Sequence, residues 1–417
     1  MFHFIYSQLI RLALPFILIR LWWQGRKAPA LRRDWQHRLG VVPEMSGPVI
    51  WVHAVSVGET IAAGPLVRRL LAKELGATIL MTAMTDTGLA QARKMFGDKV
   101  AYAYAPYDTP GAIRRFLRRV NPGILVILET EIWPNMIRQC RRRRVPVFLI
   151  NARLSERSAQ GYEKVKGLAA PVMKSISWVA AQAEPDAERF RRIGVATDRV
   201  EVTGSVKFDV DVPDDVRKAS EGIRKTLEGR KVWIAGSTHS GEDEQLLSAH
   251  QNILEQHDDA LLIIVPRHPE RFDTVAAMAE AKGYRVARRS LSENPRQAQV
   301  YLGDTMGELM TLYGTSDIAF VGGSLIERGG HNPLEPAAWG MPVFSGPHVF
   351  NFETIYDRLI ADQGVQMVEG CQDLAQAVSR LMSDAQDCKA YGERALAVVN
   401  NNRGALDKVV EGIIERV

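Results

Sequence analysis

Cysteine is scarce in this chain of 417 residues, which contains only Cys140, Cys371 and Cys388. Three widely spaced cysteines, an odd number, argue against a disulfide framework and a zinc site, and they suit a reducing compartment. The sequence also has no internal repeat and no low-complexity segment. Its 46% apolar and 24% charged residues are typical of a globular protein, and its length suits two domains.

Motifs for nucleic-acid binding are also missing, and no basic stripe alternates with aromatic residues. The net charge of +5 nevertheless conceals a strong asymmetry. Residues 1–205 contain 31 Lys and Arg against 16 Asp and Glu, whereas residues 206–417 contain 22 against 32. The basic first half (+15) and the acidic second half (−10) indicate that the first half faces an anionic partner. We expect a membrane surface rather than nucleic acid.

The amino terminus lacks an uninterrupted apolar run long enough to span a bilayer. Its clean stretch, Leu12–Ile19, is shorter than the about 20 residues that the hydrocarbon layer requires, and Arg11 and Arg20 flank it. Trp22 and Trp23 stand where an interfacial aromatic belt would lie. A basic cluster follows: Arg26, Lys27, Arg32, Arg33 and Arg38.

These features predict a membrane anchor over residues 1–24 that either spans the bilayer or lies in its interface. By the positive-inside rule, the basic cluster places the rest of the chain in the cytoplasm. A cleaved signal peptide is disfavoured, because the basic cluster follows the apolar part and no small-residue cleavage site is evident. The alternative is an amphipathic helix that packs on the protein itself.

From Val49 onwards, short β-rich runs alternate with amphipathic helical stretches, with one helix expected from Glu59. The runs are almost wholly apolar, which is typical of parallel strands covered by helices on both faces. In the first half they are VIWVHA, TILMTA, VAYAYA, ILVILE, VPVFLIN, WVAAQ and VEVTG. In the second half they are KVWIAG, LLIIVP, YRVARR, VYLGD, IAFVGG, PVFSG and VQMV. The pattern predicts an α/β fold of two tandem Rossmann-like domains facing a central cleft.

The predicted domains follow from this pattern. Residues 206–230, which include Val212-Pro213-Asp214-Asp215 and a polar run, are interpreted as a linker. After the anchor over residues 1–24, we expect one Rossmann-like domain over residues 25–210 and a second over residues 211–395. A last helix over residues 396–417 is expected to pack back on the first domain.

Acidic side chains follow two strands of the first domain. Ser56 and Glu59 have the spacing of a capping box, so one interpretation of Glu59 is a helix cap. The other is a general base at the rim of the cleft, because Gly58 lets a substrate approach closely and a carboxylate suits the deprotonation of a hydroxyl.

The segment ETEIWPN follows the strand ILVILE and contains Glu129 and Glu131. Asn135 at its end is explained as the cap of the next helix. Two acids at the end of an apolar strand instead indicate an active-site position in this architecture. Lys207, at the end of the first domain, is either a solvated linker lysine or a contact for a phosphate or a carboxylate.

In the second domain, the segments Gly236–His239 and Pro266–Arg271 each follow a strand. The first segment also precedes a helix, whose amino terminus is a usual site for an anion, and Arg267 can clamp a phosphate through two hydrogen bonds. A third segment, Gly322–Pro336, is rich in glycine and ends in GGHNPLEP.

Within that third segment, Asn332 as cap, Pro333 as first helical residue and Glu335 at the third position form a second capping arrangement. Glu335 is alternatively a ligand of ribose hydroxyls. The Asp209-Val210-Asp211 sequence matches a DxD motif that binds metal in a different enzyme architecture. Because one DxD is a common accident and this one lies in the expected linker, we predict no metal site and no cofactor.

Together these segments resemble the family of bacterial 3-deoxy-D-manno-octulosonic acid (Kdo) transferases, which are glycosyltransferases of the GT-B fold. Seven segments in register carry the resemblance along nearly the whole chain: HAVSVGE (53–59), ETEIWPN (129–135), NARLSERS (151–158), TGSVKFD (203–209), PRHPER (266–271), GDTMGEL (303–309) and FVGGSLIERGGHNPLEPA (320–337). The resemblance implies an inverting transfer of Kdo from CMP-Kdo to lipid IVA, a tetraacyldisaccharide 1,4'-bisphosphate, in lipopolysaccharide biosynthesis. A basic, membrane-facing first domain suits such an anionic lipid acceptor.

The resemblance also implies roles for single residues. Glu59 matches the general base of the family. Glu131 and Lys207 match residues that support the transition state, with Glu129 as the alternative to Glu131. The implied CMP-binding positions are Pro266, Arg267, His268, Met306, Gly307, Glu308, Asn332, Pro333, Leu334 and Glu335.

Two other functions remain open on the sequence alone. A UDP-sugar transferase or a UDP-GlcNAc 2-epimerase has the same architecture and would release UDP or epimerise its substrate. A membrane-bound scaffold that binds a sugar nucleotide without turnover is the second alternative. The joint presence of Glu59, Glu131 and Lys207 argues against a scaffold.

Overall fold

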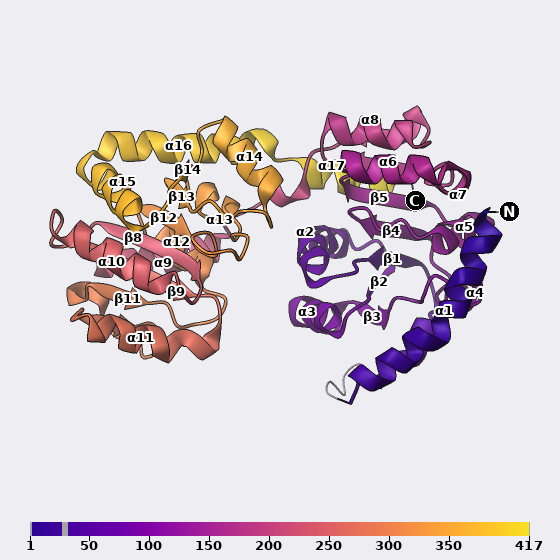
Figure 1. Ribbon diagram of the computed structural model, residues 1–417, viewed down its shortest axis with the longest axis horizontal. Coiled ribbons are helices and arrows are strands. Elements are labelled where there is room, and N and C mark those ends of the chain that lie inside the picture. Colours follow the sequence, from indigo (N-terminus) through magenta and orange to yellow (C-terminus); the bar gives the residue numbers. More distant parts are fainter. Residues whose placement is uncertain (1, 27–31, 417) are drawn as a thin grey trace. The chain divides into compact units, whose positions relative to one another are not determined.

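The computed structural model describes residues 2–26 and 32–416, so Lys27 of the basic cluster lies outside the described part. The chain divides into two compact units: unit 1 comprises Met1–Asp209 with Arg403–Val417, and unit 2 comprises Val210–Asn402. Each unit contains one sheet of seven parallel strands between layers of helices (Figure 1). The predicted α/β class with two Rossmann-like sheets is confirmed.

The sheet of unit 1 has the strand order β3-β2-β1-β4-β5-β6-β7. Its strands are β1 (Val49–His53), β2 (Thr78–Ala83), β3 (Ala101–Tyr104), β4 (Ile124–Leu128), β5 (Val147–Ala152), β6 (Trp178–Ala181) and β7 (Val200–Val202). Every residue of the central strands β1, β4 and β5 is buried. Burial on both faces explains why these runs contain almost no polar residues.

Helices cover both faces of this sheet. On one face lie α4 (Pro110–Val120), α5 (Pro134–Arg142), α7 (Lys166–Met173) and α8 (Glu184–Arg192). On the other lie α2 (Val57–Ala72), α3 (Asp86–Phe96) and the last helix of the chain, α17 (Ala405–Glu415). The short helix α6 (Glu156–Lys164) precedes α7. Because α17 buries Leu406, Val409 and Ile413 against the sheet, the carboxyl-terminal segment completes the core of unit 1.

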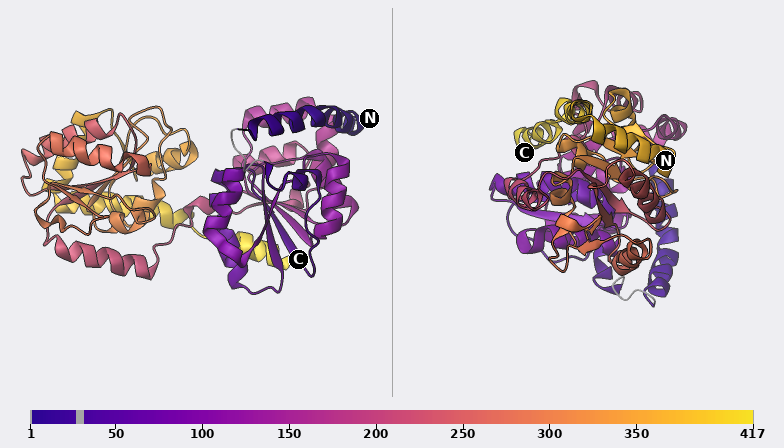
Figure 2. Two further views of the ribbon diagram at one scale, coloured as in Figure 1. Left: turned by 90° about the horizontal axis from the view of Figure 1, so that it is seen from below. Right: turned by 90° about the vertical axis from the view of Figure 1, so that its left-hand side faces the viewer.

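The first helix, α1 (Phe2–Gln24), lies lengthwise against unit 1 (Figure 2). The Tyr6 hydroxyl donates a hydrogen bond of 2.9 Å to Asp108, and the Ser7 hydroxyl donates one of 2.9 Å to Asn135. The other side of the helix exposes large apolar side chains: Phe4, Leu9, Leu12, Phe16, Ile19 and Trp23. By length and composition α1 can cross a membrane, with a mean hydropathy of 1.6 over Phe2–Trp23. The expected apolar helix is therefore present, with one side tied to the protein.

The sheet of unit 2 has the strand order β10-β11-β9-β8-β12-β13-β14. Its strands are β8 (Val232–Thr238), β9 (Leu261–Pro266), β10 (Val286–Arg288), β11 (Val300–Leu302), β12 (Ile318–Val321), β13 (Val343–Ser345) and β14 (Gln366–Met367). Its helices are α9 (Asp214–Thr226), α10 (Asp243–Leu254), α11 (Phe272–Ala281), α12 (Leu309–Gly314), α13 (Leu334–Ala338), α14 (Glu353–Ala361), α15 (Cys371–Ser383) and α16 (Ala385–Asn402).

Several short 3₁₀ turns connect these elements. They are η2 (Trp35–Leu39), η3 (Gly97–Lys99), η4 (Thr197–Arg199), η5 (Val206–Phe208), η6 (Pro269–Arg271) and η7 (Pro295–Gln297). Two of them, η5 and η6, lie within segments that the sequence singled out, after β7 and after β9. Lys207 is therefore held in a turn rather than in an extended linker.

The interpretation of residues 206–230 as a linker is wrong. Asp214–Thr226 forms helix α9, in which the Arg224 guanidinium bonds to the Thr315 carbonyl at 3.0 Å and to the Asp317 carboxylate at 2.8 Å. The polar residues that suggested a linker form the solvated side of this helix. Only a narrow stripe packs on unit 2, so the apolar periodicity was too weak to predict it.

Three predicted helix starts also need correction. The helix expected from Glu59 begins at Val57. Asn135 is not the cap of α5, which begins at Pro134 after Trp133. Helix α13 begins at Leu334, one residue later than the predicted start at Pro333. Such shifts are common because the first turn of a helix is defined by caps and local geometry more than by hydrophobic pattern.

Each sheet has one position where the strand order reverses: β1 beside β4 in unit 1 and β8 beside β12 in unit 2. In doubly wound sheets, ligands bind at the carboxyl ends of the strands at this position. The segments that follow these four strands contain Glu59, Glu131, His239 and the Gly322–Pro336 loop. The topology therefore places most of the predicted functional segments at the two positions where binding is expected.

Candidate active-site residues

Glu59 lies at the reversal point of unit 1, in the first turn of α2. The Ser56 hydroxyl caps the helix by accepting a hydrogen bond of 3.3 Å from the Glu59 N–H. The Glu59 carboxylate bends back over the helix start, where it accepts bonds from the Val55 N–H at 2.7 Å and from the Ser56 hydroxyl at 3.1 Å. The capping interpretation is thus confirmed, and the same contacts hold the carboxylate at the carboxyl edge of the sheet.

The Glu59 carboxylate also has a raised pKa. Burial raises its pKa to about 7, helped by the negative charges of Glu131 and Glu129 and opposed by the bonds from Val55 and Ser56. A carboxylate with a pKa near 7 is half deprotonated at neutral pH and holds a proton more firmly than an ordinary glutamate. Those are the properties of an efficient general base. The capping and catalytic interpretations are therefore compatible.

A buried chain of aromatic side chains supports Glu131. The Trp133 Nε1–H donates a bond of 2.9 Å to the Glu131 carboxylate, and the His53 ring packs edge-on against Trp133 with 4.8 Å between ring centroids. Behind His53, the Trp51 Nε1–H donates to the Thr82 hydroxyl at 2.8 Å. The same hydroxyl shares a hydrogen bond with His53 Nδ1, 2.9 Å away.

The His53 ring is completely buried, and its Nδ1 is bonded to the Thr82 hydroxyl. Burial lowers the pKa of His53 to about 3, so the ring is neutral. His53 Nε2 has no hydrogen-bond partner among the described residues. The ring nevertheless packs against Trp133 and thereby fixes the side chain that holds Glu131.

Glu129 and Lys207 are brought together, although no feature of the sequence indicated that they pair. Lys207 Nζ lies 3.5 Å from the Glu129 carboxylate, with 34% and 37% of the two side chains exposed. Asn151 holds the neighbouring turn, because its side-chain oxygen accepts bonds from the Ser205 hydroxyl at 3.2 Å and the Val206 N–H at 3.3 Å. The cation is thus fixed at the carboxyl ends of β4, β5 and β7.

Asp108 is a structurally central residue that the sequence analysis missed. Its carboxylate accepts bonds from the N–H groups of Asn135 at 3.0 Å and Met136 at 2.7 Å, and from the Tyr6 hydroxyl. Burial raises its pKa to about 6. Asp108 therefore caps α5 from outside the helix and ties it to α1. No local spacing signals this role, because 27 residues separate Asp108 from Asn135.

Two histidines meet at the reversal point of unit 2. His239 follows β8, His331 lies in the glycine-rich loop, and their Nε2 atoms are 2.9 Å apart with the ring planes only 1° from parallel. The His268 ring packs edge-on against His239, with 5.3 Å between centroids. Burial, together with the positive charges of Arg267 and nearby cations, lowers the pKa of both His239 and His331 to about 4. Both rings are therefore neutral at pH 7.

Asn332 and Glu335 are joined by a hydrogen bond, although Asn332 is not the helix cap that the sequence predicted. The Asn332 side-chain oxygen accepts a bond of 3.1 Å from the Leu334 N–H, and its amide donates to the Glu335 carboxylate at 3.3 Å. Burial raises the pKa of Glu335. The preceding Pro333 occupies the cap position of α13. The segment therefore presents a buried, protonatable carboxyl group beside the glycine-rich loop.

The side chain of Glu308 is engaged within the protein. The Arg289 guanidinium donates two bonds to its carboxylate, at 2.9 and 3.1 Å, and the Thr305 hydroxyl donates a third. Gly307 adopts a φ of +90°, which favours glycine, and the Met306 side chain is exposed. The segment 306–308 therefore offers a ligand mainly its backbone and the Met306 side chain.

Asp209 of the DxD sequence is a helix cap. Its two carboxylate oxygens accept bonds of 2.7 Å from the N–H groups of Gly404 and Leu406, at the start of α17. Within residues 2–26 and 32–416, no group of three or more His, Cys, Asp or Glu side chains is arranged to hold a metal ion. The first carboxylate of the motif therefore has a structural role that its sequence does not reveal.

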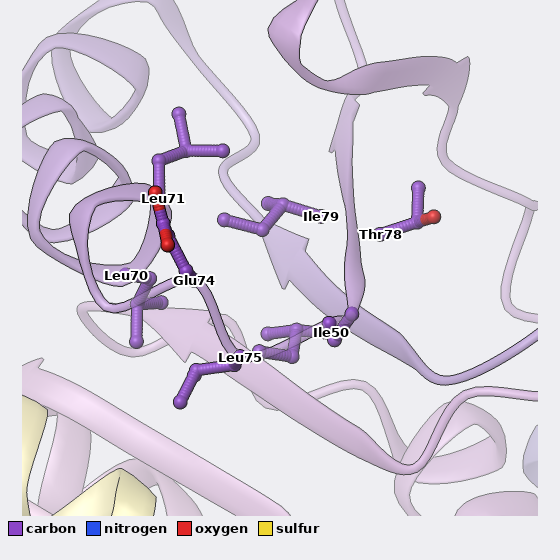
Figure 3. A pocket seen from close by; sticks show the side chains of 9 residues that line it. Ile50, Leu70, Leu71, Glu74, Leu75, Thr78 and Ile79 are labelled. Carbon is purple, nitrogen blue, oxygen red and sulfur yellow. The ribbon is translucent and has the colours of Figure 1, made fainter.

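A cavity of about 260 Å³ lies at the opposite edge of the unit 1 sheet (Figure 3). It is lined by Ile50, Ile79 and Thr78 near the starts of β1 and β2, and by Leu70 and Glu74 from the end of α2. Most of these side chains are aliphatic. The cavity therefore lies away from the residues discussed above and offers little chemistry.

Comparison with known proteins follows the same division of the chain. Residues 33–210 match the family described as 3-deoxy-D-manno-octulosonic-acid transferase (kdotransferase), and residues 242–398 match the group 1 glycosyl transferases. The chain is similar to the 3-deoxy-D-manno-octulosonic acid transferase of Haemophilus influenzae. The two are 40% identical over 99% of this chain and 98% of that protein.

Solved structures add two similarities. A C-terminal CMP-Kdo binding domain from Acinetobacter baumannii is 35% identical, covers 44% of this chain and 98% of that domain, and superposes with a TM-score of 0.43. The UDP-GlcNAc 2-epimerase of Neisseria meningitidis superposes with a TM-score of 0.58 over 88% of this chain and 100% of that one. At 15% identity, the second similarity extends to the fold alone.

Proposed function

This chain belongs to the 3-deoxy-D-manno-octulosonic acid (Kdo) transferase family, and on that premise we propose that it adds Kdo to lipid IVA with inversion at the anomeric carbon. As a member of the family it is a glycosyltransferase that uses CMP-Kdo as donor. The membership removes the reason to consider a UDP-sugar enzyme or a scaffold without turnover. The observation that carries the mechanism is the Glu59 carboxylate, whose pKa is raised to about 7 at the reversal point of unit 1.

In the proposed reaction, Glu59 takes the proton of the acceptor hydroxyl as its oxygen attacks the anomeric carbon of Kdo. The bond between that carbon and the phosphate oxygen breaks on the opposite face, and CMP leaves with the electron pair. A single displacement of this kind inverts the anomeric configuration. Glu59 suits the first step because its pKa matches neutral pH and the bonds from Val55 and Ser56 fix its position.

We assign the supporting charges in unit 1 to Glu131 and Lys207. The negative charge of Glu131 raises the pKa of Glu59 and stabilises positive charge that develops on the sugar ring. The Lys207 cation offsets negative charge on the acceptor or the donor, and Glu129 orients it through their ion pair. The bond from Trp133 to Glu131 and the pairing of Glu129 with Lys207 together favour Glu131, rather than Glu129, as the carboxylate that acts on the substrate.

The donor nucleotide is assigned to unit 2. Arg267 and His268 follow β9, and the Asn332–Glu335 segment supplies the buried carboxyl group suited to ribose hydroxyls. Because the Glu308 carboxylate is engaged by Arg289, the segment 306–308 is expected to contact the nucleotide through its backbone. Pro266, which ends β9, keeps the following arginine at the edge of the sheet.

The acceptor and the membrane are assigned to unit 1. Exposed arginines of α4 and α5, such as Arg114, Arg118 and Arg142, suit the phosphates of lipid IVA. Other arginines of these helices hold neighbouring elements. The Arg115 guanidinium, for example, donates two hydrogen bonds to the Leu39 carbonyl, at 2.9 and 2.7 Å. The exposed apolar side of α1 fits an anchor on the cytoplasmic face of the inner membrane.

One experiment tests the whole proposal. The purified chain is incubated with CMP-Kdo and lipid IVA in neutral detergent, the released CMP is quantified, and the lipid product is weighed by mass spectrometry. We expect CMP release to match the mass added to the lipid, and Glu59→Gln protein to give neither. Release of CMP without a heavier lipid would reduce the activity to donor hydrolysis and reject lipid IVA as acceptor.

A further inference from the structure

The His239–His331 pair lies at the carboxyl ends of β8 and β12. Their Nε2 atoms are 2.9 Å apart, so one neutral ring donates a hydrogen bond and the other accepts it. Gly323 packs directly over both rings. A Cβ added there would come within 3.0 Å of the His331 ring and 3.5 Å of the His239 ring. The backbone thus leaves just enough room for the imidazole pair and holds it in place.

The pair is surrounded by positive charge. Arg267, Arg271, Arg328 and His268 lie close enough to lower the pKa of His239, after the larger effect of burial. Arg271 is neutralised by a salt bridge to Asp243. Arg267 and Arg328 are exposed and form no salt bridge with any residue in the described part of the chain. A cationic cluster whose exposed arginines form no ion pair, beside neutral N–H donors, is suited to a bound anion.

The carboxylate of Glu242, in the segment after β8, bonds to backbone N–H groups rather than to these arginines. Glu242 is completely buried, and four backbone N–H groups donate to its oxygens: His239 at 3.1 Å, Gly323 at 2.7 Å, and Ser324 and Leu325 at 2.9 Å each. Successive N–H groups of this kind form a nest that often binds phosphate. Here the protein fills the nest with its own anion.

This filled nest has two consequences. An incoming phosphate cannot use these backbone groups and must be bound by side chains instead. Glu242 also joins the segment after β8 to the loop after β12, because its carboxylate bonds to both. Since the two histidines come from these two segments, Glu242 sets the spacing of their rings.

We propose that the His239–His331 pair is the site that binds the phosphate of the nucleotide donor, with Glu242 as the residue that positions it. This inference rests on the proposed function, which supplies CMP-Kdo as the donor. On binding, the pair exchanges its internal hydrogen bond for two N–H bonds to phosphate oxygens. The accepting ring does so by moving its own proton from Nδ1 to Nε2 through solvent, so no net proton is gained or lost.

The same site assists departure of the leaving group. When the sugar–oxygen bond breaks, its electron pair stays on the phosphate oxygen, and CMP carries one more negative charge than it did as a diester. N–H donors that are already oriented toward the phosphate stabilise this charge more than the charge of the ground state. Arg267 and Arg328 add positive charge without a metal ion.

Comparison of CMP with cytidine isolates the phosphate contact. Both ligands are titrated into the purified full-length chain in detergent, by calorimetry, using wild type, His239→Ala, His331→Ala and Glu242→Gln proteins. The matched control is His257→Ala, which removes an imidazole at the amino end of β9, away from the site. Circular dichroism confirms folding, and His239→Gln and His331→Gln serve where an alanine protein does not fold.

We expect the two alanine substitutions to weaken CMP binding about tenfold to a hundredfold, as for lost hydrogen bonds to a charged group, and to leave cytidine binding unchanged. Glu242→Gln should also weaken CMP binding and leave cytidine binding unchanged, although Glu242 itself does not contact the ligand. The double histidine variant should be no weaker than about the worse single variant, because the rings act as a pair.

Contrary results would distinguish failure of the phosphate site from failure of the proposed function. Folded histidine variants that bind CMP like the wild type would overturn the phosphate site while leaving the proposed function intact. Equal loss of CMP and cytidine affinity would show that the histidines only maintain the fold, and would also overturn it. Wild-type protein that binds CMP no better than cytidine would reject this site and the CMP-sugar donor together.

Discussion

Lys207 and Glu129 form an ion pair of 3.5 Å between the ends of β7 and β4, two strands that are not neighbours in the sheet. The pair fixes the position of a cation at the edge of unit 1. A salt bridge with a third of each side chain exposed contributes about 0–1 kcal/mol to folding. Its small effect on stability makes a functional role easy to separate from a structural one.

Lys207→Ala should therefore lower kcat/KM by about a hundredfold or more, while the melting temperature changes little. Glu129→Gln should lower it less than tenfold, because the cation remains. Steady-state rates with CMP-Kdo and lipid IVA give both values. A larger loss of kcat/KM for Glu129→Gln than for Lys207→Ala would instead make Glu129 the carboxylate that acts on the substrate.

Glu59→Gln should reduce the rate by about 10²–10⁴-fold, which is the usual contribution of a general base. CMP affinity should not change, because the nucleotide is assigned to unit 2. The amide keeps an oxygen that can accept the Val55 bond, so the start of α2 should survive. Rapid turnover by a folded Glu59→Gln protein would limit Glu59 to capping its helix.

The value of kcat/KM should increase with pH, with its midpoint at about pH 7. A general base acts only when deprotonated, and the pKa of Glu59 is raised to about 7, so acid removes activity below that value. Glu131→Gln removes a negative charge that raises this pKa, so the rising limb should move to lower pH even though the maximal rate falls. If the rising limb of the Glu131→Gln profile lies at the same pH as that of the wild type, a group other than Glu59 controls it.

Asp209→Ala should cost about 1–2 kcal/mol of stability, the usual value for loss of a helix cap. Its carboxylate accepts two N–H bonds at the start of α17.

The reaction should not need a divalent metal ion. Asp211→Ala should therefore have a mild effect on activity, and excess EDTA should not change the initial rate of the wild type. Activity that EDTA abolishes and magnesium restores, together with an inactive Asp211→Ala protein, would establish a metal-dependent reaction instead.

Deletion of residues 2–24 should leave a folded protein that binds CMP but associates less with membranes. The loss of the Tyr6 and Ser7 hydrogen bonds should reduce the stability of unit 1 by about 1–3 kcal/mol. Tyr6→Phe is the matched control, because it breaks the bond to Asp108 and keeps the apolar side of α1. A truncated chain that cannot fold would make α1 part of the core rather than an anchor.

The sequence predicted the sheets well because their signal is local. The central strands β1, β4 and β9 consist almost wholly of apolar residues, so no single substitution would disguise them. Helix α9 escaped prediction because its exposed side dominates its composition, and only Ser220 is fully buried along its length. An apolar pattern predicts elements that are buried on both sides better than elements that are buried on one side only.

The candidate site was only partly readable from the sequence. The carboxylates at strand ends, Glu59 and Glu131, could be found because their position in a doubly wound fold is itself informative. The interactions of Asp108 and Glu242 could not, because each binds backbone groups that tertiary structure brings together. A buried carboxylate that caps a distant segment leaves no periodic or spacing signal in its own neighbourhood.

Helix α17 has a consequence for biosynthesis. The ribosome makes residues 405–415 after the whole of unit 2, yet they cover one face of the first unit's sheet with Leu406, Val409 and Ile413. Unit 2 is continuous in sequence and can fold before α17 has been made, but unit 1 must wait for α17. Polypeptides that stop before Ala405 therefore expose an apolar surface to chaperones and proteases, so only chains that include α17 reach a stable first unit.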